Sequence, residues 1–265
     1  MPRTLPRSLA PIVEDLELDQ PKVVTLRMLA ELVARHDVGT DTKVVAARLR
    51  ERGWLLKTGT RGVWEFAPGS HAGAYGNGDP VLPLQAVLAV HPQLPAALAL
   101  NTAAWAWGYA DRVPTRLDVA VPTLAAAPSA LLAQTNVMVF RPALEPLRAK
   151  GAPVHRPESV VAHLASSPDV VRSWGAVLEW LPDLAGDLSG DALQRELCGR
   201  SRAVRVRAGY LLAGLRPDLA EPLHDAVRDP VRFGPRQAKV RRYARDWRVI
   251  DSLLPVDPRM LEAAA

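Results

Sequence analysis

Apolar residues near the start of the chain recur every three or four positions, which is the spacing of one face of an amphipathic helix. The pattern predicts helices over residues 7–18 and 26–36, and a third that begins near residue 42 and ends at Gly53. Thr25 is the expected N-cap of the second helix, because its hydroxyl can accept a hydrogen bond from a free amide of the first turn.

Only a few residues separate the second and third helices. Residues 37–39 have the composition of a tight turn, and Gly39 is expected in the left-handed conformation that often follows a helix. The cap of the third helix is expected to be Thr40, Asp41 or Thr42. Two helices joined in this way predict a helix-turn-helix.

After Gly53 the pattern changes from helical to β-prone. Residues 54–58 (WLLKT) and 63–68 (VWEFAP) are short runs rich in large apolar side chains on either side of a Gly-x-x-Gly turn, which predicts a hairpin. A hairpin placed directly after a helix-turn-helix predicts the wing of a winged helix. Residues 70–80 are rich in glycine and polar side chains, which is typical of a flexible linker.

Beyond the linker the apolar segments are longer, and several end at a proline. Residues 82–92 and 95–110 predict buried helices, residues 116–122 and 135–142 predict strands, and segments between residues 157 and 254 predict six further helices.

The expected fold class is therefore α+β and mostly helical. A winged helix-turn-helix DNA-binding domain is predicted at residues 1–69 and a linker at residues 70–80. Residues 81–265 are predicted to form a larger C-terminal domain in which helices wrap a small sheet.

Composition and charge narrow the classes of protein to consider. The 265 residues are 48% hydrophobic and 23% charged, which is ordinary for a globular protein. A net charge of +5 permits a polyanionic partner without indicating one. The single cysteine, Cys198, excludes an internal disulfide and a cysteine-based zinc site, and it fits a cytoplasmic location. Prolines interrupt the uncharged stretch between Asp79 and Asp111, so no membrane span is expected.

The third predicted helix carries a basic face. Lys43, Ala47 and Arg50 are spaced i, i+4 and i+7, with Arg48 at the flank. A cationic face with a small residue at its centre fits a DNA major groove, where lysine and arginine reach guanine edges and phosphates. Thr42 at the start of the helix offers a hydroxyl and a backbone amide to a phosphate.

The tip of the predicted hairpin is basic as well. Lys57, Thr58, Thr60 and Arg61 lie at or beside it, where they are expected to contact the DNA backbone or an adjacent minor groove. A simpler alternative is a solvated helix face beside a purely structural hairpin. The ordered combination of basic helix and basic wing favours DNA binding over that alternative.

Several stretches resemble one known family. Residues 48–68 (RLRERGWLLKTGTRGVWEFAP) are similar to the end of the winged helix of AbiEi-type antitoxins, mycobacterial members included. Residues 83–122 are similar to the start of the C-terminal domain of that family. The likeness continues in residues 158–184 and 207–215, so it covers most of the chain.

The resemblance implies the antitoxin of a type IV or related toxin–antitoxin operon, whose toxin is a nucleotidyltransferase. It implies that the protein represses its own operon by binding inverted repeats in promoter DNA, while the C-terminal domain counteracts the toxin. The DNA contacts that it implies are Thr42, Lys43, Arg48, Arg50, Lys57 and Arg61.

Enzyme and metal motifs are absent from the sequence. It has no P-loop, no dinucleotide-binding glycine fingerprint, no H-E-x-x-H and no G-x-S-x-G. The six histidines are scattered, so neither a metal nor a cofactor is expected. Asp118 lies in an apolar strand, as in some nucleases, but the acidic-x-Lys pair that they need is missing from the next strand. A non-enzymatic protein is therefore predicted.

Two of the predicted C-terminal helices, residues 201–215 and 234–254, are rich in arginine. Tyr243 and Trp247, four residues apart, would either face a partner or pack in the core. Two other functions stay open: an interaction protein that neutralises a toxin by contact through the C-terminal domain, and an RNA-binding regulator that uses these helices. The residues predicted to form a partner surface are Arg205, Arg207, Arg241, Arg242 and Arg245.

Overall fold

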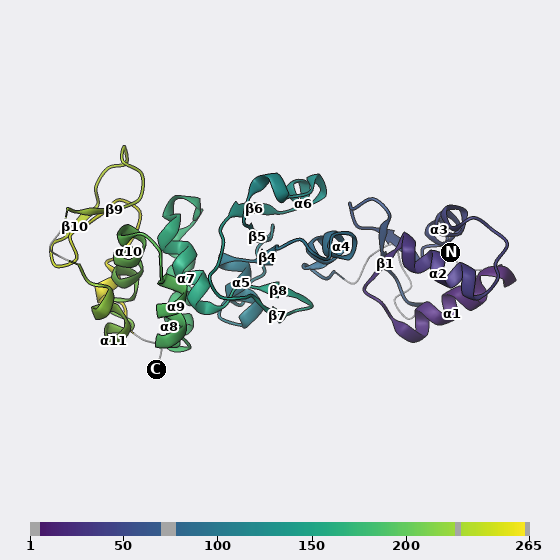
Figure 1. The fold of residues 1–265 in the computed structure, drawn as a ribbon, viewed down its shortest axis with the longest axis horizontal. Coiled ribbons are helices and arrows are strands. Elements are labelled where there is room, and N and C mark those ends of the chain that lie inside the picture. Colours follow the sequence, from purple (N-terminus) through teal and green to yellow (C-terminus); the bar gives the residue numbers. More distant parts are fainter. Residues whose placement is uncertain (1–5, 70–77, 226–228, 263–265) are drawn as a thin grey trace. The chain divides into compact units, whose positions relative to one another are not determined.

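The computed structural model describes residues 6–69, 78–225 and 229–262. Contacts between residues divide the chain into two compact units (Figure 1). The first unit comprises the described residues of Met1–Leu94 together with Ala126–Thr135, and the second comprises Pro95–Ala125 together with Asn136–Ala265. The fold is α+β and mostly helical, which confirms the predicted class.

Three helices of the first unit lie near the start of the chain: α1 (Ala10–Asp19), α2 (Leu26–Arg35) and α3 (Thr42–Glu51). A 3-10 turn, η1 (Arg7–Leu9), precedes α1. Thr25 caps α2 as predicted, because its hydroxyl accepts a hydrogen bond from the amide of Met28 at 3.1 Å.

Asp41 provides the cap of α3, with its carboxylate accepting from the amide of Lys43 at 2.8 Å. The expectation for Gly39 is wrong: Asp37 takes the left-handed conformation in the turn, with φ of 46°. Aspartate tolerates this conformation better than most residues do. The amide of His36 accordingly closes α2 by donating to Leu32, without help from the glycine.

A three-stranded sheet follows the helices and includes a strand that the sequence did not predict. The predicted hairpin forms β2 (Leu55–Lys57) and β3 (Val63–Phe66), and β1 (Val23–Thr25) pairs with β3 to give the order β1-β3-β2. Helices α2 and α3, the hairpin and β1 have the topology of a winged helix-turn-helix.

Helices α4 (Leu82–Val90) and α6 (Ser129–Gln134) complete the first unit. α4 packs against β1 and β3 and also against α6, although the predicted boundary assigned it to the second domain. Most of the predicted linker, residues 70–80, lies outside the described residues, and the boundary there stays a prediction.

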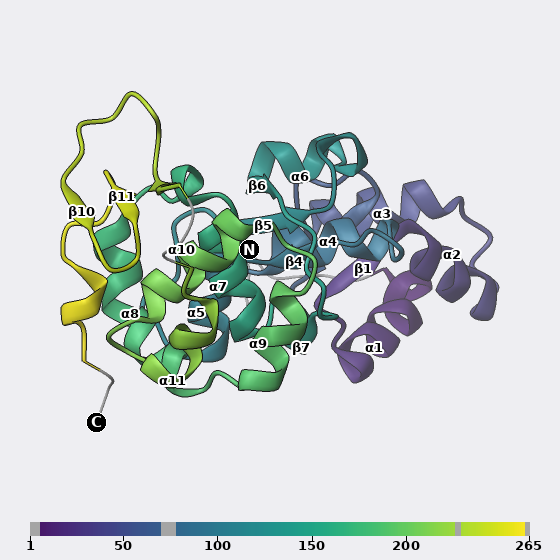
Figure 2. The same ribbon diagram turned by 60° about the vertical axis from the view of Figure 1, so that its left-hand side comes forward.

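A five-stranded mixed sheet, of order β6-β5-β4-β8-β7, lies in the second unit (Figure 2). The two strands predicted from the sequence are β5 and β6, which pair in parallel from Asp118 opposite Asn136 to Val121 opposite Val139. The strands are β4 (Ala97–Leu98), β5 (Asp118–Val121), β6 (Asn136–Val139), β7 (Leu147–Ala149) and β8 (Ala152–Val154).

Most of the helices predicted in the second unit form, and two of them start later than predicted. Residues 95–98 are not helical, because Leu98 pairs with strands on both of its sides. The helix predicted from residue 168 begins only at Trp174, where the hydroxyl of Ser173 caps it. The α-helices are α5 (Leu100–Trp107), α7 (Pro157–Ser166), α8 (Trp174–Gly186), α9 (Gly190–Leu197), α10 (Arg202–Leu212) and α11 (Pro217–Ala220). Short 3-10 turns are η3 (Leu124–Ala126), η4 (Pro168–Val170), η5 (Glu221–Leu223) and η6 (Pro258–Met260).

The helix predicted over residues 234–254 is wrong. The segment contains β10 (Arg242–Ala244) and β11 (Val249–Asp251), which pair antiparallel, and β9 (Val231–Phe233) joins them in the order β10-β11-β9. The side chains follow a period of two along β10, since Tyr243 is exposed between Arg242, which is half-buried, and Ala244, which is buried. Helix α10 packs against this small sheet.

A buried carboxylate joins three segments of the second unit. Glu196 in α9 has no exposed surface, and its side chain accepts hydrogen bonds from the amides of Ala143 and Leu144 at 2.9–3.1 Å. The hydroxyl of Ser159 in α7 donates at 2.8 Å, and the Arg200 guanidinium forms an ion pair with the carboxylate. A buried charge needs such a set of partners to offset its desolvation.

Two histidines lie beside this carboxylate, although they are distant in the sequence. His155 and His163 are buried, with ring centroids 6.0 Å apart, and His163 stacks on Phe140 at 4.3 Å. Burial lowers the pKa of His155 to about 4 and that of His163 to about 3. Both rings are therefore neutral in the folded protein at neutral pH.

Acid is expected to destabilise the protein through these two rings. The unfolded chain binds protons below a pKa of about 6.5 whereas the folded protein does not, so stability is full above about pH 6.5 and falls as the pH drops toward 4. At pH 4.5 His163 alone contributes a loss of about 3 kcal/mol. Urea unfolding at pH 7.5 and 4.5 would measure it, and the variant His163→Phe should lose about 3 kcal/mol less than the parent. An equal loss in both proteins would contradict the assignment.

Candidate nucleic-acid interface

Helix α3 is oriented by the residues that it buries. Val45 and Leu49 are fully buried and Ala46 is almost fully buried, so the opposite face of the helix points to solvent. On that solvent face Lys43, Arg48 and Arg50 are exposed, while Thr42 and Ala47 are half-buried. The basic face predicted from the sequence is therefore present on the surface of the first unit.

The cations of this face and of the wing have no acidic partner. Among the described residues, no carboxylate lies within 4 Å of Lys43, Arg48, Arg50, Lys57 or Arg61, whereas Lys22, Arg27 and Arg35 of the same unit form ion pairs. Lysine and arginine side chains without a fixed partner remain available to phosphates and base edges.

A groove brings the helix and the wing together. It has a volume of about 330 Å³, and Ala47 and Arg50 of α3 line it together with Lys57 of β2. Leu55 and Leu56 of β2 also line this groove, as does Glu51. The structure thus places three of the predicted contact residues around one concave surface.

The hydroxyls of the two threonines of the wing are shielded from solvent within the turn. Thr58 is only 7% exposed, and its hydroxyl donates to the carbonyl of Val63 at 2.9 Å and accepts from the amide of Thr60 at 3.3 Å. The hydroxyl oxygen of Thr60 is also shielded from solvent. Lys57 and Arg61 remain exposed beside them, so the cations offer more surface to DNA than the hydroxyls do.

The wing tip contacts a segment that is distant in the sequence. Gly59 has φ of +81°, and a Cβ placed on it would lie 2.6 Å from the side-chain oxygen of Gln134 in α6. Gln134 is itself held by a hydrogen bond to the carbonyl of Ala130 at 3.0 Å. The absence of a side chain at Gly59 therefore allows both the positive φ of the turn and the close approach of Gln134. No local sequence signal links residue 134 to the wing, so the sequence alone does not predict the contact between Gln134 and the wing tip.

Two of the acids near this surface have structural roles. The Asp41 carboxylate is the cap of α3, and Glu65 in β3 is 6% exposed. Asp37 and Glu51 remain exposed. Asp41 is exposed as well, so these three carboxylates still offset part of the charge of the basic face.

The predicted C-terminal partner residues do not form one surface. Arg207 donates to the carbonyls of Arg232 at 2.6 Å and Ala165 at 3.2 Å, and burial lowers the pKa of its guanidinium. Arg242 pairs with the buried carboxylate of Asp251 at 2.9 Å. The guanidiniums of these two arginines are thus engaged inside the second unit.

The other three predicted arginines, Arg205, Arg241 and Arg245, are exposed. Trp247 is buried at 7% exposure and Tyr243 is 49% exposed, so the two aromatic residues do not share a face. The core alternative is therefore confirmed for Trp247, whereas a role of Tyr243 in facing a partner stays a prediction.

The polar group around Asp118 has the character of a structural site. Its carboxylate accepts from Asn136 at 3.1 Å and Asn101 at 3.4 Å, and burial raises its pKa. Within the described part of the chain, no three His, Cys, Asp or Glu side chains gather as metal ligands. None of the helices in that part has the length and apolar composition needed to span a bilayer.

Comparison with known proteins gives two similarities. Residues 96–214 match the family model of the AbiEi antitoxin C-terminal domain, which confirms the predicted resemblance. Among solved structures, the crystal structure of the RV2827C protein from Mycobacterium tuberculosis is similar with a TM-score of 0.80 and 28% sequence identity. That similarity covers 96% of this chain and 94% of the other. A comparison with curated proteins found no match.

Substitution of the wing glycine is expected to destabilise the first unit. Gly59→Ala adds a Cβ at positive φ and against Gln134, which should cost about 1–3 kcal/mol in the free energy of unfolding. The double variant with Gln134→Ala should recover only the steric part of this cost. Gly39→Ala is the matched control, because no atom lies within 4 Å of a Cβ there. Denaturant unfolding measures all three variants, and equal stability of Gly59→Ala and Gly39→Ala would refute the contact.

Proposed function

We propose that the chain, whose residues 96–214 match the family model of the AbiEi antitoxin C-terminal domain, is the antitoxin of a toxin–antitoxin operon and represses that operon by binding its promoter. The proposed DNA target is a duplex with inverted repeats, and the proposed toxin is a nucleotidyltransferase. The protein itself acts by binding and not by catalysis. The observation that carries the proposal is the set of unpaired cations on α3 and the wing.

In the proposed complex α3 lies in the major groove. Its half-buried Ala47 allows close approach to the bases, while Lys43, Arg48 and Arg50 reach base edges and phosphates. The start of α3 adds the positive end of the helix dipole near Thr42. This geometry needs no movement of the buried face, because Val45 and Leu49 hold the helix against the core.

The wing extends the interface along the DNA backbone. Lys57 and Arg61 are the contact residues proposed there, because the hydroxyls of Thr58 and Thr60 are shielded in the turn. Five cations without an acidic partner limit the number of phosphates that each bound copy of the protein can neutralise. The slope of log K against log salt should therefore be no steeper than about −4.5 for each bound copy, since each neutralised phosphate contributes about −0.9.

Removal of one cation from α3 and one from the wing tests the proposal. Arg50→Ala is expected to weaken binding of the full chain to its own promoter by roughly 5- to 150-fold, the range for a lost base contact. Arg61→Ala is expected to weaken promoter and unrelated duplex alike and to reduce the salt slope by about 1. Fluorescence anisotropy at two salt concentrations measures both effects.

The matched control is Arg112→Ala, which removes an exposed arginine of the second unit and should leave promoter affinity unchanged. If Arg50→Ala and Arg61→Ala bound the promoter as tightly as Arg112→Ala does, α3 and the wing would not form the DNA interface.

Neutralisation of the toxin by direct contact is a second candidate function, and a groove in the second unit supports it. The groove has a volume of about 490 Å³, and apolar side chains of α9, α11 and η5 line it, among them Leu193, Leu197 and Leu219. Arg205 also lines it and donates to the carbonyl of Arg200 at 3.1 Å, and the described structure has no carboxylate within 4 Å of its guanidinium. The acid that lines the groove, Asp218, is paired with Arg216. An apolar groove beside a cation that has no acidic partner fits a protein segment with apolar side chains and a carboxylate.

Cys198 provides a direct test of this second candidate. It is exposed, lines the groove and is the single cysteine of the chain. Alkylation with a bulky maleimide is expected to weaken binding to the toxin encoded in the same operon by at least about tenfold, while promoter binding stays unchanged. The alkylated Cys198→Ser protein is the control. Toxin binding that is unaffected by the label would exclude this groove as the contact.

A further inference from the structure

Strand β10 presents an exposed aromatic side chain between two exposed arginines. Arg241, Tyr243 and Arg245 are separated by two residues each, and all three are exposed, with Tyr243 at 49%. β10 is an edge strand, and the amide of Arg241 extends its ladder by donating to the carbonyl of Asp251 at 2.9 Å. Arg241 and Tyr243 stand on one side of the strand by its period of two, and Arg245 is the first residue of the turn that follows it; these three exposed side chains are called the β10 face below.

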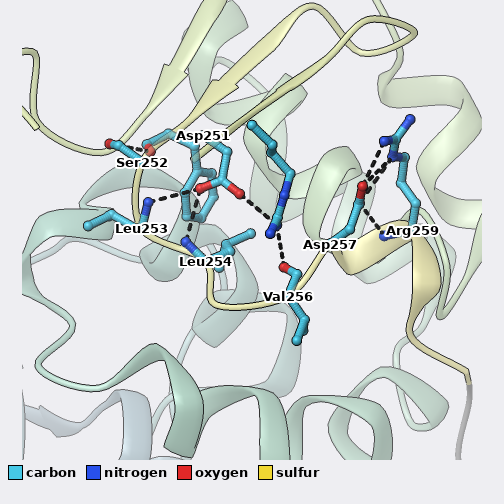
Figure 3. A network of polar contacts seen from close by, with 9 residues as sticks. Asp251, Ser252, Leu253, Leu254, Val256, Asp257 and Arg259 are labelled. Carbon is cyan, nitrogen blue, oxygen red and sulfur yellow. Dashed lines mark hydrogen bonds and ion pairs between the residues drawn. The ribbon is translucent and has the colours of Figure 1, made fainter. Parts of the chain in front are cut away.

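The opposite side of β10 is fixed by a buried polar network. Arg242 donates to the Asp251 carboxylate at 2.9 Å and also to the carbonyl of Val256. The same carboxylate accepts from the amides of Leu253 and Leu254, both at 2.9 Å (Figure 3). Because Arg242 is held inward in this way, its neighbours Arg241 and Tyr243 are held outward.

The acids near the β10 face are already engaged, so its cations remain free. Asp246 pairs with Arg259 at 2.8 Å. Asp257 accepts three hydrogen bonds from the same guanidinium, the shortest at 2.7 Å (Figure 3). In the described chain, no carboxylate lies within 4 Å of Arg241 or Arg245. Between residues 231 and 248 the sequence has seven arginines or lysines and one acid, so the region favours a polyanion.

We propose that the β10 face binds single-stranded nucleic acid, with a base stacked on Tyr243 and phosphates held by Arg241 and Arg245. An exposed ring between cations is the arrangement by which proteins bind single strands, because every unpaired base offers a π-face. A duplex hides these faces in its stack. The distance along the strand from residue 241 to residue 243 is about 7 Å, which spans about two nucleotides of a stacked strand.

This activity is independent of the proposed promoter binding. It uses residues that follow the family-matched segment, 96–214, and that lie in the second unit. A single-stranded ligand can therefore bind whether or not α3 and the wing contact DNA.

The test uses the full chain with Arg50→Ala and Arg61→Ala, so that the first unit contributes little to nucleic-acid binding. Fluorescein-labelled 12-mers of uridine and of thymidine, and a 12-base-pair duplex, are titrated by anisotropy. Binding to at least one single strand that is at least tenfold tighter than to the duplex is the expected result. Binding that is equal or tighter for the duplex, or absent for both single strands, would overturn the proposal.

Variants of the β10 face separate stacking from charge. Tyr243→Ala should weaken single-strand binding by about tenfold or more, while Tyr243→Phe should retain most of the affinity. Arg241→Ala should reduce the salt slope by about 0.7, the value for one phosphate of a single strand. Met260→Ala and Arg195→Ala are controls, because both residues are exposed elsewhere in the second unit.

Two outcomes of these variants would also count against the proposal. Unchanged affinity of Tyr243→Ala would show that the aromatic ring contributes nothing. Loss of toxin binding by Tyr243→Ala, with no binding of either single strand, would assign the β10 face to a protein partner instead. Circular dichroism confirms that each variant is folded, as expected for exposed side chains.

Discussion

Hydrogen bonding between short strands that are distant in the sequence is the constraint on which this fold depends. β1 has three residues and pairs with β3 about forty residues later, and Thr25 is both the last residue of β1 and the cap of α2. Strands this short are not stable alone. The pairing of β1 therefore fixes where α2 begins, α2 packs on α3, and the basic face of α3 takes its orientation from that packing.

The distribution of hydrogen-bond partners decides which arginines can meet another molecule. A guanidinium carries five N–H donors, and several arginines of the second unit use these donors in hydrogen bonds to backbone carbonyls. Arg216 donates to Ala185 and Leu188, and Arg207 to Ala165 and Arg232, so each joins segments that are far apart in the sequence. The net charge of +5 is thus a poor guide to function, whereas the arginines without internal partners mark the surfaces that can bind polyanions.

Local periodicity predicted much of the first unit and less of the second. The helices, the hairpin and the Thr25 cap follow from spacing and capping rules, and the basic face follows from them. β1 and β4 were missed because strands of two or three residues carry no pattern of their own. The spacing of the arginine-rich segment after residue 234 predicts a helix. The segment instead forms strands, in which Arg242 forms an ion pair with the buried carboxylate of Asp251. The groove beside α3 and the contact of Gln134 with Gly59 depend on tertiary packing, which spacing does not report.

The path of the chain through the two units has a consequence at the level of the gene. Residues 126–135 belong to the first unit although they are encoded within the segment matched to the antitoxin C-terminal domain, and Gln134 among them contacts the wing. A gene fragment that ends at codon 94 therefore encodes α3 and the hairpin without α6, and one that ends at codon 80 lacks α4 as well. Exchange of such fragments between related genes would combine a wing with an α6 to which it is not adapted. Compatible exchanges would have to preserve the glycine at the wing tip, or replace residue 134 at the same time.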